Sequence, residues 1–201
     1  MRHLPNSIAL RKLDPLTLFV GVTAAWPLHY RGQYDAAAKQ IERMLDMYPK
    51  DIGLLSYLHQ LRAESFLERG MERQAVDEYL QSESFGGASP EAIAALRSSY
   101  ETSGMKGYWQ KSVDLEEEKH RKEIEQVGGA GKYLTSVPLA KLYARLDDRD
   151  KTFATLETCF QNRDENLLFL KVESIRGASP WRGIRSDPRF ISLLRRMGLG
   201  G

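Results

Sequence analysis

The sequence predicts an all-α fold built from antiparallel helix pairs, and three observations support this prediction. A glycine is followed by an alanine five residues later at both Gly32 and Gly70, as expected where a turn leads into a closely packed helix. Pro15 lies 34 residues before Pro49, which indicates a repeating unit of that length. Between Gly32 and Pro49, apolar residues recur at the three- and four-residue spacing of one helix face: Tyr34, Ala37, Ile41, Met44, Leu45 and Tyr48.

Composition and charge place the chain among globular proteins. Hydrophobic residues make up 42% of the chain, enough to build a core, which argues against intrinsic disorder. The net charge of +2 argues against direct binding to nucleic acid or to a membrane surface. The apolar run from Leu16 to Tyr30 is shorter than the ~20 residues that a membrane-spanning helix needs. We therefore expect a cytoplasmic protein.

The residues that usually carry chemistry are sparse. Cys159 is the single cysteine, so no disulfide forms within the chain, and helical spacing predicts that it is a small buried hydrophobic residue. The four histidines are scattered without clustered metal ligands, and no Ser/His/Asp, Cys/His or paired-carboxylate arrangement stands at a usable spacing. We expect no enzyme activity, no cofactor and no metal.

Breaker residues divide the chain into four helix pairs and two terminal segments. The pairs are expected over residues 18–51, 56–89, 90–126 and 133–164, preceded by a truncated repeat or cap over 1–15 and followed by a C-terminal cap over 165–201. Pro27 should kink the first helix, which runs from Leu18 to Arg31. Gly104 is the third turn glycine. Trp109 occupies the position where the earlier pairs have a small residue, so it should force the third pair apart or rotate it.

The expected C-terminal cap has its own signals. Trp181 should fill the cap as an aromatic plug. Asp187 is an expected N-cap, followed by a first-turn proline and a final amphipathic helix that Gly198 ends. Seven Lys or Arg residues between Lys171 and Arg196 leave a basic docking patch as an alternative to a solvated capping surface.

The helix–turn–helix unit, its turn glycines and its 34-residue spacing resemble the tetratricopeptide repeat (TPR) family. The ending from Leu167 to Leu199 resembles the C-terminal end of TPR regions in large bacterial regulators or kinases. The resemblance implies a right-handed α-solenoid that forms a single domain over residues 1–201. Its concave groove would be lined by the first helix of each repeat. The Lys, Asn and Arg clamp of the chaperone-binding branch is absent, because Val22 and Trp26 stand at its positions.

Carried over residue by residue, the resemblance implies a partner-binding groove. Its expected lining residues are Phe19, Val22, Trp26, His29, Tyr30, Tyr57, Gln60, Glu64 and Lys141, with Glu68, Glu91, Ser98 and Arg145 at further groove positions. The first part of this groove would be aromatic, its middle acidic and its far end basic. Aromatic surfaces of this kind form interface hot spots. A peptide with an apolar anchor and mixed charge should fit best.

The sequence therefore favours a non-catalytic protein–protein interaction module that binds a peptide or partner domain. Three alternatives stay open. The array could assemble with itself, as a homo-oligomer, through the incomplete first repeat or the long helix after Gly104. It could sense a small molecule as part of a bacterial regulator. Trp26 and Tyr30 could also pack on the first segment of the chain instead of on a partner.

Overall fold

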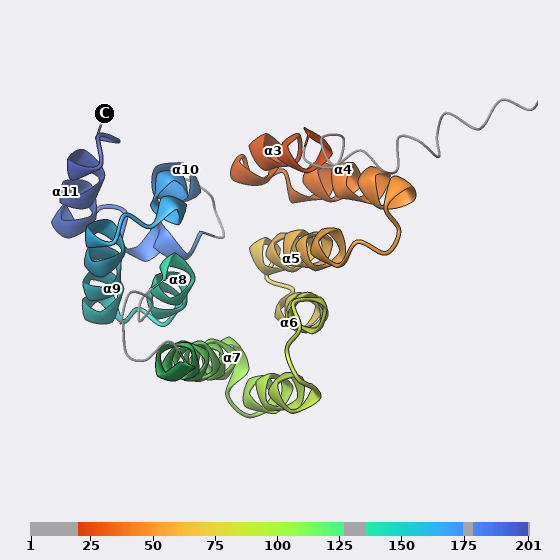
Figure 1. The fold of residues 1–201 in the computed structure, drawn as a ribbon. Helices are drawn as coiled ribbons and strands as arrows, with labels where there is room; N and C mark the ends of the chain where they lie inside the picture. Colours follow the sequence, from red (N-terminus) through yellow and green to blue (C-terminus); the bar gives the residue numbers. More distant parts are fainter. Residues whose placement is uncertain (1–19, 127–135, 175–178, 201) are drawn as a thin grey trace, which may run out of the picture. The chain divides into compact units, whose positions relative to one another are not determined.

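The computed structural model describes residues 20–126, 136–174 and 179–200, and every regular element in these ranges is helical (Figure 1). The chain divides into two compact units, unit 1 (Met1–Ile93) and unit 2 (Ala94–Gly201), so the expected single domain stays a prediction. The α-helices are α3 (Trp26–Tyr30), α4 (Tyr34–Met47), α5 (Ile52–Glu68), α6 (Glu72–Phe85), α7 (Pro90–Gln126), α8 (Val137–Arg145), α9 (Arg149–Gln161), α10 (Leu170–Ser174) and α11 (Pro188–Arg196). Two 3-10 helices, η1 (Glu165–Phe169) and η2 (Pro180–Gly183), complete the C-terminal part.

In unit 1, helices α3 to α6 pack in sequence order, each against its neighbour, which confirms the all-α class and the antiparallel packing of consecutive helices. The apolar face that was expected for α4 is buried against α5. Its core members are Ala25, Tyr34, Ala37, Ala38, Ile41, Met44, Leu54, Leu58 and Leu61. Ala37 and Ala75 are fully buried, as the predicted close helix contacts require.

The turns that follow α3 and α5 adopt the same backbone conformation. Gly32 and Gly70 both have a φ of 72°, in the left-handed region where a glycine avoids the cost of a Cβ atom. After each of them the next amide reaches back five residues, from Gln33 to the Leu28 carbonyl and from Met71 to the Phe66 carbonyl, each at 2.9 Å. In the fourth pair Asp147 takes the same conformation with a φ of 57°. The predicted turn positions are confirmed.

The helix predicted from Leu18 to Arg31 is not continuous. Residues 20–23 are helical, Ala24 and Ala25 form a turn, and α3 begins at Trp26, whereas Leu18 and Phe19 lie outside the described residues. Pro27 then occupies the first turn of α3, where its missing N–H costs nothing, because the first N–H groups of a helix have no intrahelical acceptor. The proline therefore starts a new helix instead of kinking one, which corrects the prediction.

Helix α5 begins four residues before the predicted start of the second pair. Asp51 is its N-cap, and its Oδ1 accepts a hydrogen bond of 2.9 Å from the Leu54 amide. Asp51 and the first turn of α5 lie close to Trp26 of α3.

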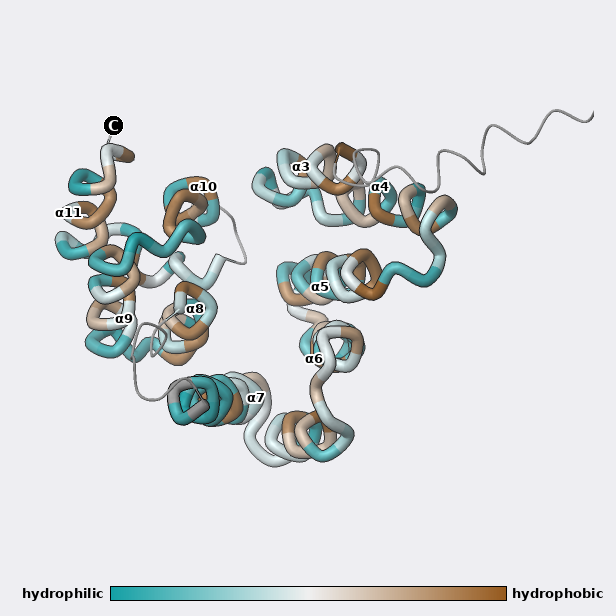
Figure 2. Tube along the Cα trace, viewed as in Figure 1, coloured by the Kyte–Doolittle hydropathy of each residue, from teal (hydrophilic) through white to brown (hydrophobic). Residues whose placement is uncertain are grey.

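The third pair is made by the two halves of α7, which the non-helical residues Ser103 and Gly104 separate. The predicted run of the second half to Gln126 is confirmed, and its later part is hydrophilic (Figure 2). The small residue at the helix contact is Gly107: a Cβ atom there would lie 2.2 Å from the Ser99 carbonyl oxygen. Trp109 is buried two residues later and stacks under the Arg145 guanidinium at 4.5 Å. The sequence predicted Trp109 at the close helix contact, whereas the structure has Gly107 there, two residues earlier.

Unit 2 closes around Trp181, which is fully buried as the predicted plug. Its core combines residues from α8, α9, α10, both 3-10 helices and α11: Val137, Ala140, Leu156, Cys159, Leu167, Leu170, Trp181, Ile184, Phe190 and Leu193. Cys159 is completely buried there, as expected. The predicted N-cap at Asp187 is confirmed by a 2.9 Å hydrogen bond from the Arg189 amide.

Helices α9 and α11 are joined by the same contact twice, seven residues apart on each helix. Arg189 stacks on Phe153 at 4.1 Å and bonds to Asp150 at 3.1 Å. Arg196 stacks on Phe160 at 4.3 Å and bonds to both carboxylate oxygens of Glu157, at 2.7 and 2.8 Å. Two of the cations in the predicted basic stretch are therefore used to hold the final helix in place.

The Glu157–Arg196 pair predicts a pH-dependent contribution to stability. The hydrogen bond from Arg196 holds the pKa of Glu157 below its ordinary value of 4.5 in the folded state. A depressed folded pKa means that the stabilisation is complete above the unfolded pKa and is lost as the pH falls through the folded pKa. Urea unfolding should show that the advantage of the wild type over Glu157→Gln shrinks as the pH is lowered below 4.5. The control Glu125→Gln, at an exposed position in α7, should show no such trend.

Candidate functional site

A pocket of about 280 Å³ opens in unit 1 beside α3 and the first turns of α5. Its lining residues are Val22, Trp26, Asp51, Gly53, Leu54 and Tyr57. Three of the residues predicted to bind a partner meet at one hollow: Val22 and Trp26, which are four residues apart, and Tyr57 from α5. The lining is mostly apolar, which is typical of sites that bury a ligand side chain.

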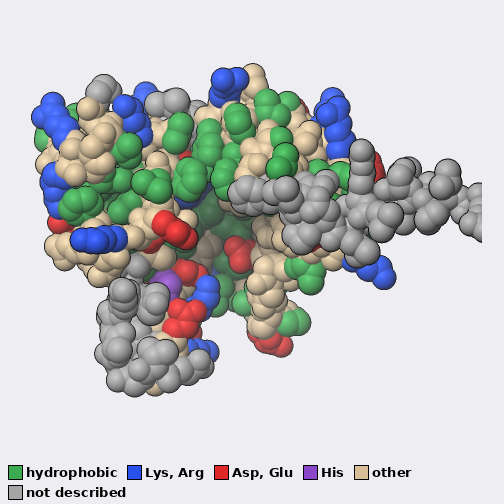
Figure 3. All heavy atoms as spheres, turned by 45° about the horizontal axis from the view of Figure 1, so that its top comes forward, with side chains coloured by type: hydrophobic (Ala, Val, Ile, Leu, Met, Phe, Trp, Pro, Cys, Tyr) green, Lys and Arg blue, Asp and Glu red, His purple; other side chains and the backbone are tan. Residues whose placement is uncertain are grey.

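Local sequence features explain why this pocket is open. Trp26 is 36% exposed although its ring belongs to a type that usually packs inside. Gly53 has no side chain, so that part of the wall is backbone. Ile52, the neighbouring first residue of α5, is 60% exposed. Hydrophobic side chains also gather over the region of α3 on the face drawn in Figure 3. Exposed apolar residues that cluster in this way mark interaction sites more often than scattered ones do.

A buried polar cluster lies directly behind the pocket. His29 is 8% exposed and Glu64 is 6% exposed. The His29 ring contacts the Glu64 Oε2 through Nε2 at 3.1 Å and the Tyr57 hydroxyl through Nδ1 at 2.9 Å. The Glu64 carboxylate accepts from Nε2–H, and the Tyr57 hydroxyl bonds to Nδ1. The cluster thereby holds Tyr57, a wall of the pocket, in place from α3.

The other predicted partner residues occupy different surroundings. Tyr30 stacks on the His29 ring with centroids 5.3 Å apart, and Gln60 is exposed on α5. Phe19 lies outside the described residues. In unit 2, Lys141 donates to the buried Glu173 at 2.8 Å, so its ammonium group serves an internal ion pair. Its assignment to a partner surface stays a prediction.

Sequence reasoning missed Asp51, Gly53 and Leu54 as pocket residues. A signal was present, since Asp51 follows the Pro49 breaker and is a good N-cap type, which predicts a helix start at that point. The meeting of this helix start with α3 is a tertiary contact, and no spacing along the chain indicates it.

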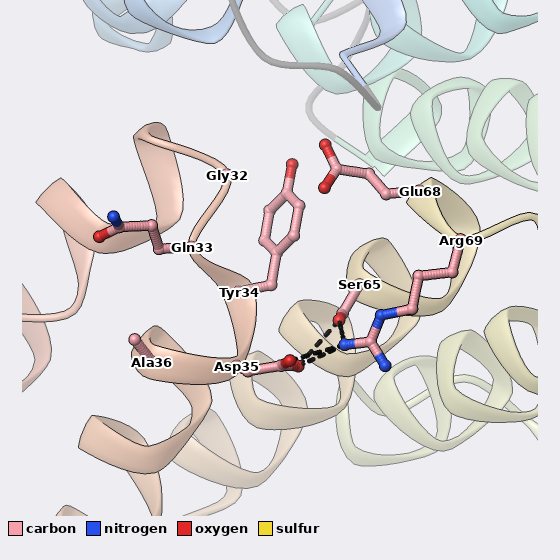
Figure 4. A pocket seen from close by; sticks show the side chains of 8 residues that line it. All are labelled: Gly32, Gln33, Tyr34, Asp35, Ala36, Ser65, Glu68 and Arg69. Atoms are coloured by element: carbon pink, nitrogen blue, oxygen red, sulfur yellow. Dashed lines mark hydrogen bonds and ion pairs between the residues drawn. The ribbon is translucent and has the colours of Figure 1, made fainter.

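A second pocket of about 480 Å³ lies at the other end of α5, beside the start of α4 (Figure 4). Of the three charged side chains that the structure describes there, Asp35 and Arg69 bond to each other, and Glu68 also lines it. Arg69 donates to both carboxylate oxygens of Asp35, at 2.8 and 2.6 Å, and Ser65 donates to the same carboxylate at 2.9 Å. The charges of Arg69 and Asp35 are therefore paired across α4 and α5.

The described residues contain no group of three or more His, Cys, Asp or Glu side chains placed to hold a metal ion. Within the same ranges, no helix is long and apolar enough to cross a membrane.

Comparison of the chain with protein-family models, curated protein sequences and solved structures finds no match. The resemblance to the TPR family therefore rests on the helix-pair spacing and the turn glycines of this chain. Any function drawn from that resemblance is a proposal.

Proposed function

We propose that this chain is a non-catalytic interaction module that binds an apolar side chain of a partner peptide or domain in the α3–α5 pocket. The observation that carries this proposal is the convergence of Val22, Trp26 and Tyr57 on one open, mostly apolar hollow. A pocket of about 280 Å³ is slightly smaller than the ~300–1,000 Å³ typical of small-molecule sites. It suits one or two anchoring side chains of a larger partner better than a whole metabolite.

We further propose that the helix pairs form a TPR-like, right-handed α-solenoid. Support comes from the order of the helices and from the turn geometry that Gly32 and Gly70 share, each with a φ of 72°; Gly104 also has a positive φ of 61° but an extended ψ of −155°. Small residues stand close after each of these turns, at Ala37, Ala75 and Gly107, and lie at the helix contacts. In such arrays binding surfaces are built by successive repeats.

Substitution of Trp26 by alanine tests the proposed function directly. Fluorescence anisotropy with labelled peptides that carry a single Phe in a neutral Gly/Ser background would measure affinity. We expect Trp26→Ala to weaken binding by about 2 kcal/mol, because an aromatic anchor at an interface is worth that much or more. The melting temperature should change little, since Trp26 is partly exposed.

The matched control is Ile191→Ala in α11, where the side chain is 38% exposed and lies outside the pocket. This variant should bind the Phe peptides as the wild type does. Equal affinity of Trp26→Ala and wild type would remove the α3–α5 pocket as the binding site. Light scattering of the free protein tests the alternative hypothesis of self-assembly, because that hypothesis requires an oligomer without any added peptide.

A further inference from the structure

We infer that the partner segment carries a lysine or arginine next to its apolar anchor, and that Asp51 binds this cation. The inference rests on the proposed function, because it names the chemistry of the partner at the same pocket. It makes the preferred ligand a basic–apolar segment instead of an apolar or acidic one.

The first support is the place of Asp51. Among the residues that the structure describes, it is the one charged residue that lines the pocket, beside Val22, Trp26, Gly53, Leu54 and Tyr57. A carboxylate at the wall of an apolar hollow is partly shielded from water, which strengthens its pairing with a cation that arrives on the ligand.

The second support is the hydrogen bonding of Asp51. Its Oδ1 caps α5 by accepting from the Leu54 amide. Among the described residues, no hydrogen bond or ion pair engages its Oδ2. Each carboxylate oxygen has two lone pairs, so Oδ2 retains its capacity to accept from a ligand ammonium or guanidinium group. The cap meanwhile fixes the position of the carboxylate, so a ligand cation need not order it.

The third support is the charge of the surrounding helices. Residues 20–93 contain eleven Asp or Glu and seven Lys or Arg. Two of these cations, Arg62 and Arg69, are held by Glu42 and Asp35 within unit 1. Lys50 is exposed beside Asp51 but does not line the pocket. An acidic surrounding of this kind favours the approach of a basic segment.

Peptides that differ only in charge test the inference. Four labelled peptides share a Gly/Ser background: Phe flanked by Lys, Phe flanked by Gln, Phe flanked by Glu, and Gly flanked by Lys. Anisotropy titrations use the full chain. We expect the Lys–Phe peptide to bind about three- to fivefold more tightly than the Gln–Phe peptide, the range for a partly exposed ion pair, and the Glu–Phe peptide to bind most weakly.

Asp51→Asn should remove this preference while it keeps the affinity for the Gln–Phe peptide. Asparagine is as good an N-cap as aspartate, so α5 should fold normally, which an unchanged melting temperature would verify. The control Asp46→Asn removes one negative charge from the exposed last turn of α4, outside the pocket, and should leave the preference intact.

The outcomes separate the inference from the proposed function. Equal binding of all three Phe peptides would overturn the inference and leave the pocket as an apolar site, as would a charge preference that survives Asp51→Asn. Equal binding of the Lys–Gly and Lys–Phe peptides would show general attraction to an acidic surface and would also overturn it. No binding of any Phe peptide would remove the proposed function itself.

Discussion

Replacing Trp181 with alanine is expected to destabilise unit 2 by about 3–5 kcal/mol, the usual cost of truncating a buried aromatic side chain. The Trp181 side chain is completely buried and contacts elements from α8 to α11 in one core. Its Nε1 also donates to Glu173 Oε2 at 3.1 Å, and Glu173 is 6% exposed. The substitution therefore opens a cavity and removes one hydrogen-bond donor from a buried carboxylate, which Lys141 also contacts.

Urea unfolding followed by far-UV circular dichroism measures this effect. Trp181→Phe is the informative second variant, because it keeps most of the apolar volume and removes only the N–H donor. We expect it to cost about 1–3 kcal/mol, the penalty for leaving a buried acceptor unsatisfied. Trp26→Ala should have a much smaller effect on the unfolding free energy. A loss below about 1 kcal/mol in Trp181→Ala would contradict the central place of this side chain, since core truncations of this size cost several times more.

Gly107→Ala is expected to destabilise the protein by about 1–3 kcal/mol, the range for overpacking a tight contact. In a helix with free space the same change would stabilise by up to about 1 kcal/mol, because alanine has the higher helix propensity. Here the added Cβ would lie 2.2 Å from the Ser99 carbonyl oxygen and 2.7 Å from the Ser103 Cβ. Backbone cannot move aside as a flexible side chain can, so the sign of the effect reverses.

The control for this prediction is Gln110→Ala, at an exposed position three residues further along α7. It should leave the unfolding free energy almost unchanged. A second comparison is Gly104→Ala, where no atom lies within 4 Å and only the positive φ of 61° causes strain. With its ψ of −155°, Gly104 lies in a backbone region that is essentially restricted to glycine, and an alanine there costs about 1–3 kcal/mol. A stabilised Gly107→Ala protein would show that the halves of α7 do not pack closely at this point.

The turns and the helices were predictable because their signals are local. A glycine at Gly32 or Gly70 satisfies the left-handed backbone that ends a helix, whatever packs around it. The same holds for Ser89, whose hydroxyl accepts from the Ala92 amide at 3.3 Å at the predicted start of α7. Periodic apolar residues then identified the buried face of α4 without any tertiary information.

In the third and first helix pairs, the packing could not be predicted from local sequence signals. Gly107 and Trp109 lie two residues apart on one helix. One is the smallest residue and the other the largest, so the packing of the neighbouring helix depends on which of them faces it. Which of them meets the partner depends on the register of two helix halves, and that register is set by the conformation of Ser103 and Gly104. Pro27 was ambiguous in the same way, because a proline can kink a helix or occupy its first turn. The turn at Ala24 and Ala25 ends the preceding helical residues, so Pro27 lies in the first turn of α3.

The candidate site divides in the same way. The aromatic residues Trp26 and Tyr57 were predicted as partner contacts from the family resemblance, and the structure brings them to one pocket. Asp51 was not predicted as a pocket residue. Its role as an N-cap has a local signal, whereas its place in the pocket depends on the contact between α3 and α5. Lys141 was expected on a surface, but Glu173, 32 residues further along the chain, engages its ammonium group.

The sequence by itself determined the helical class, the turn residues and the buried face of α4, because capping, φ preference and periodicity act within a few residues. The tertiary structure alone decided which side chains share a pocket and which charges neutralise each other. Those outcomes depend on contacts between helices that are distant in sequence, such as His29 with Glu64 and Arg196 with Glu157. Their strength comes from burial and geometry, which exist only once the helices have packed.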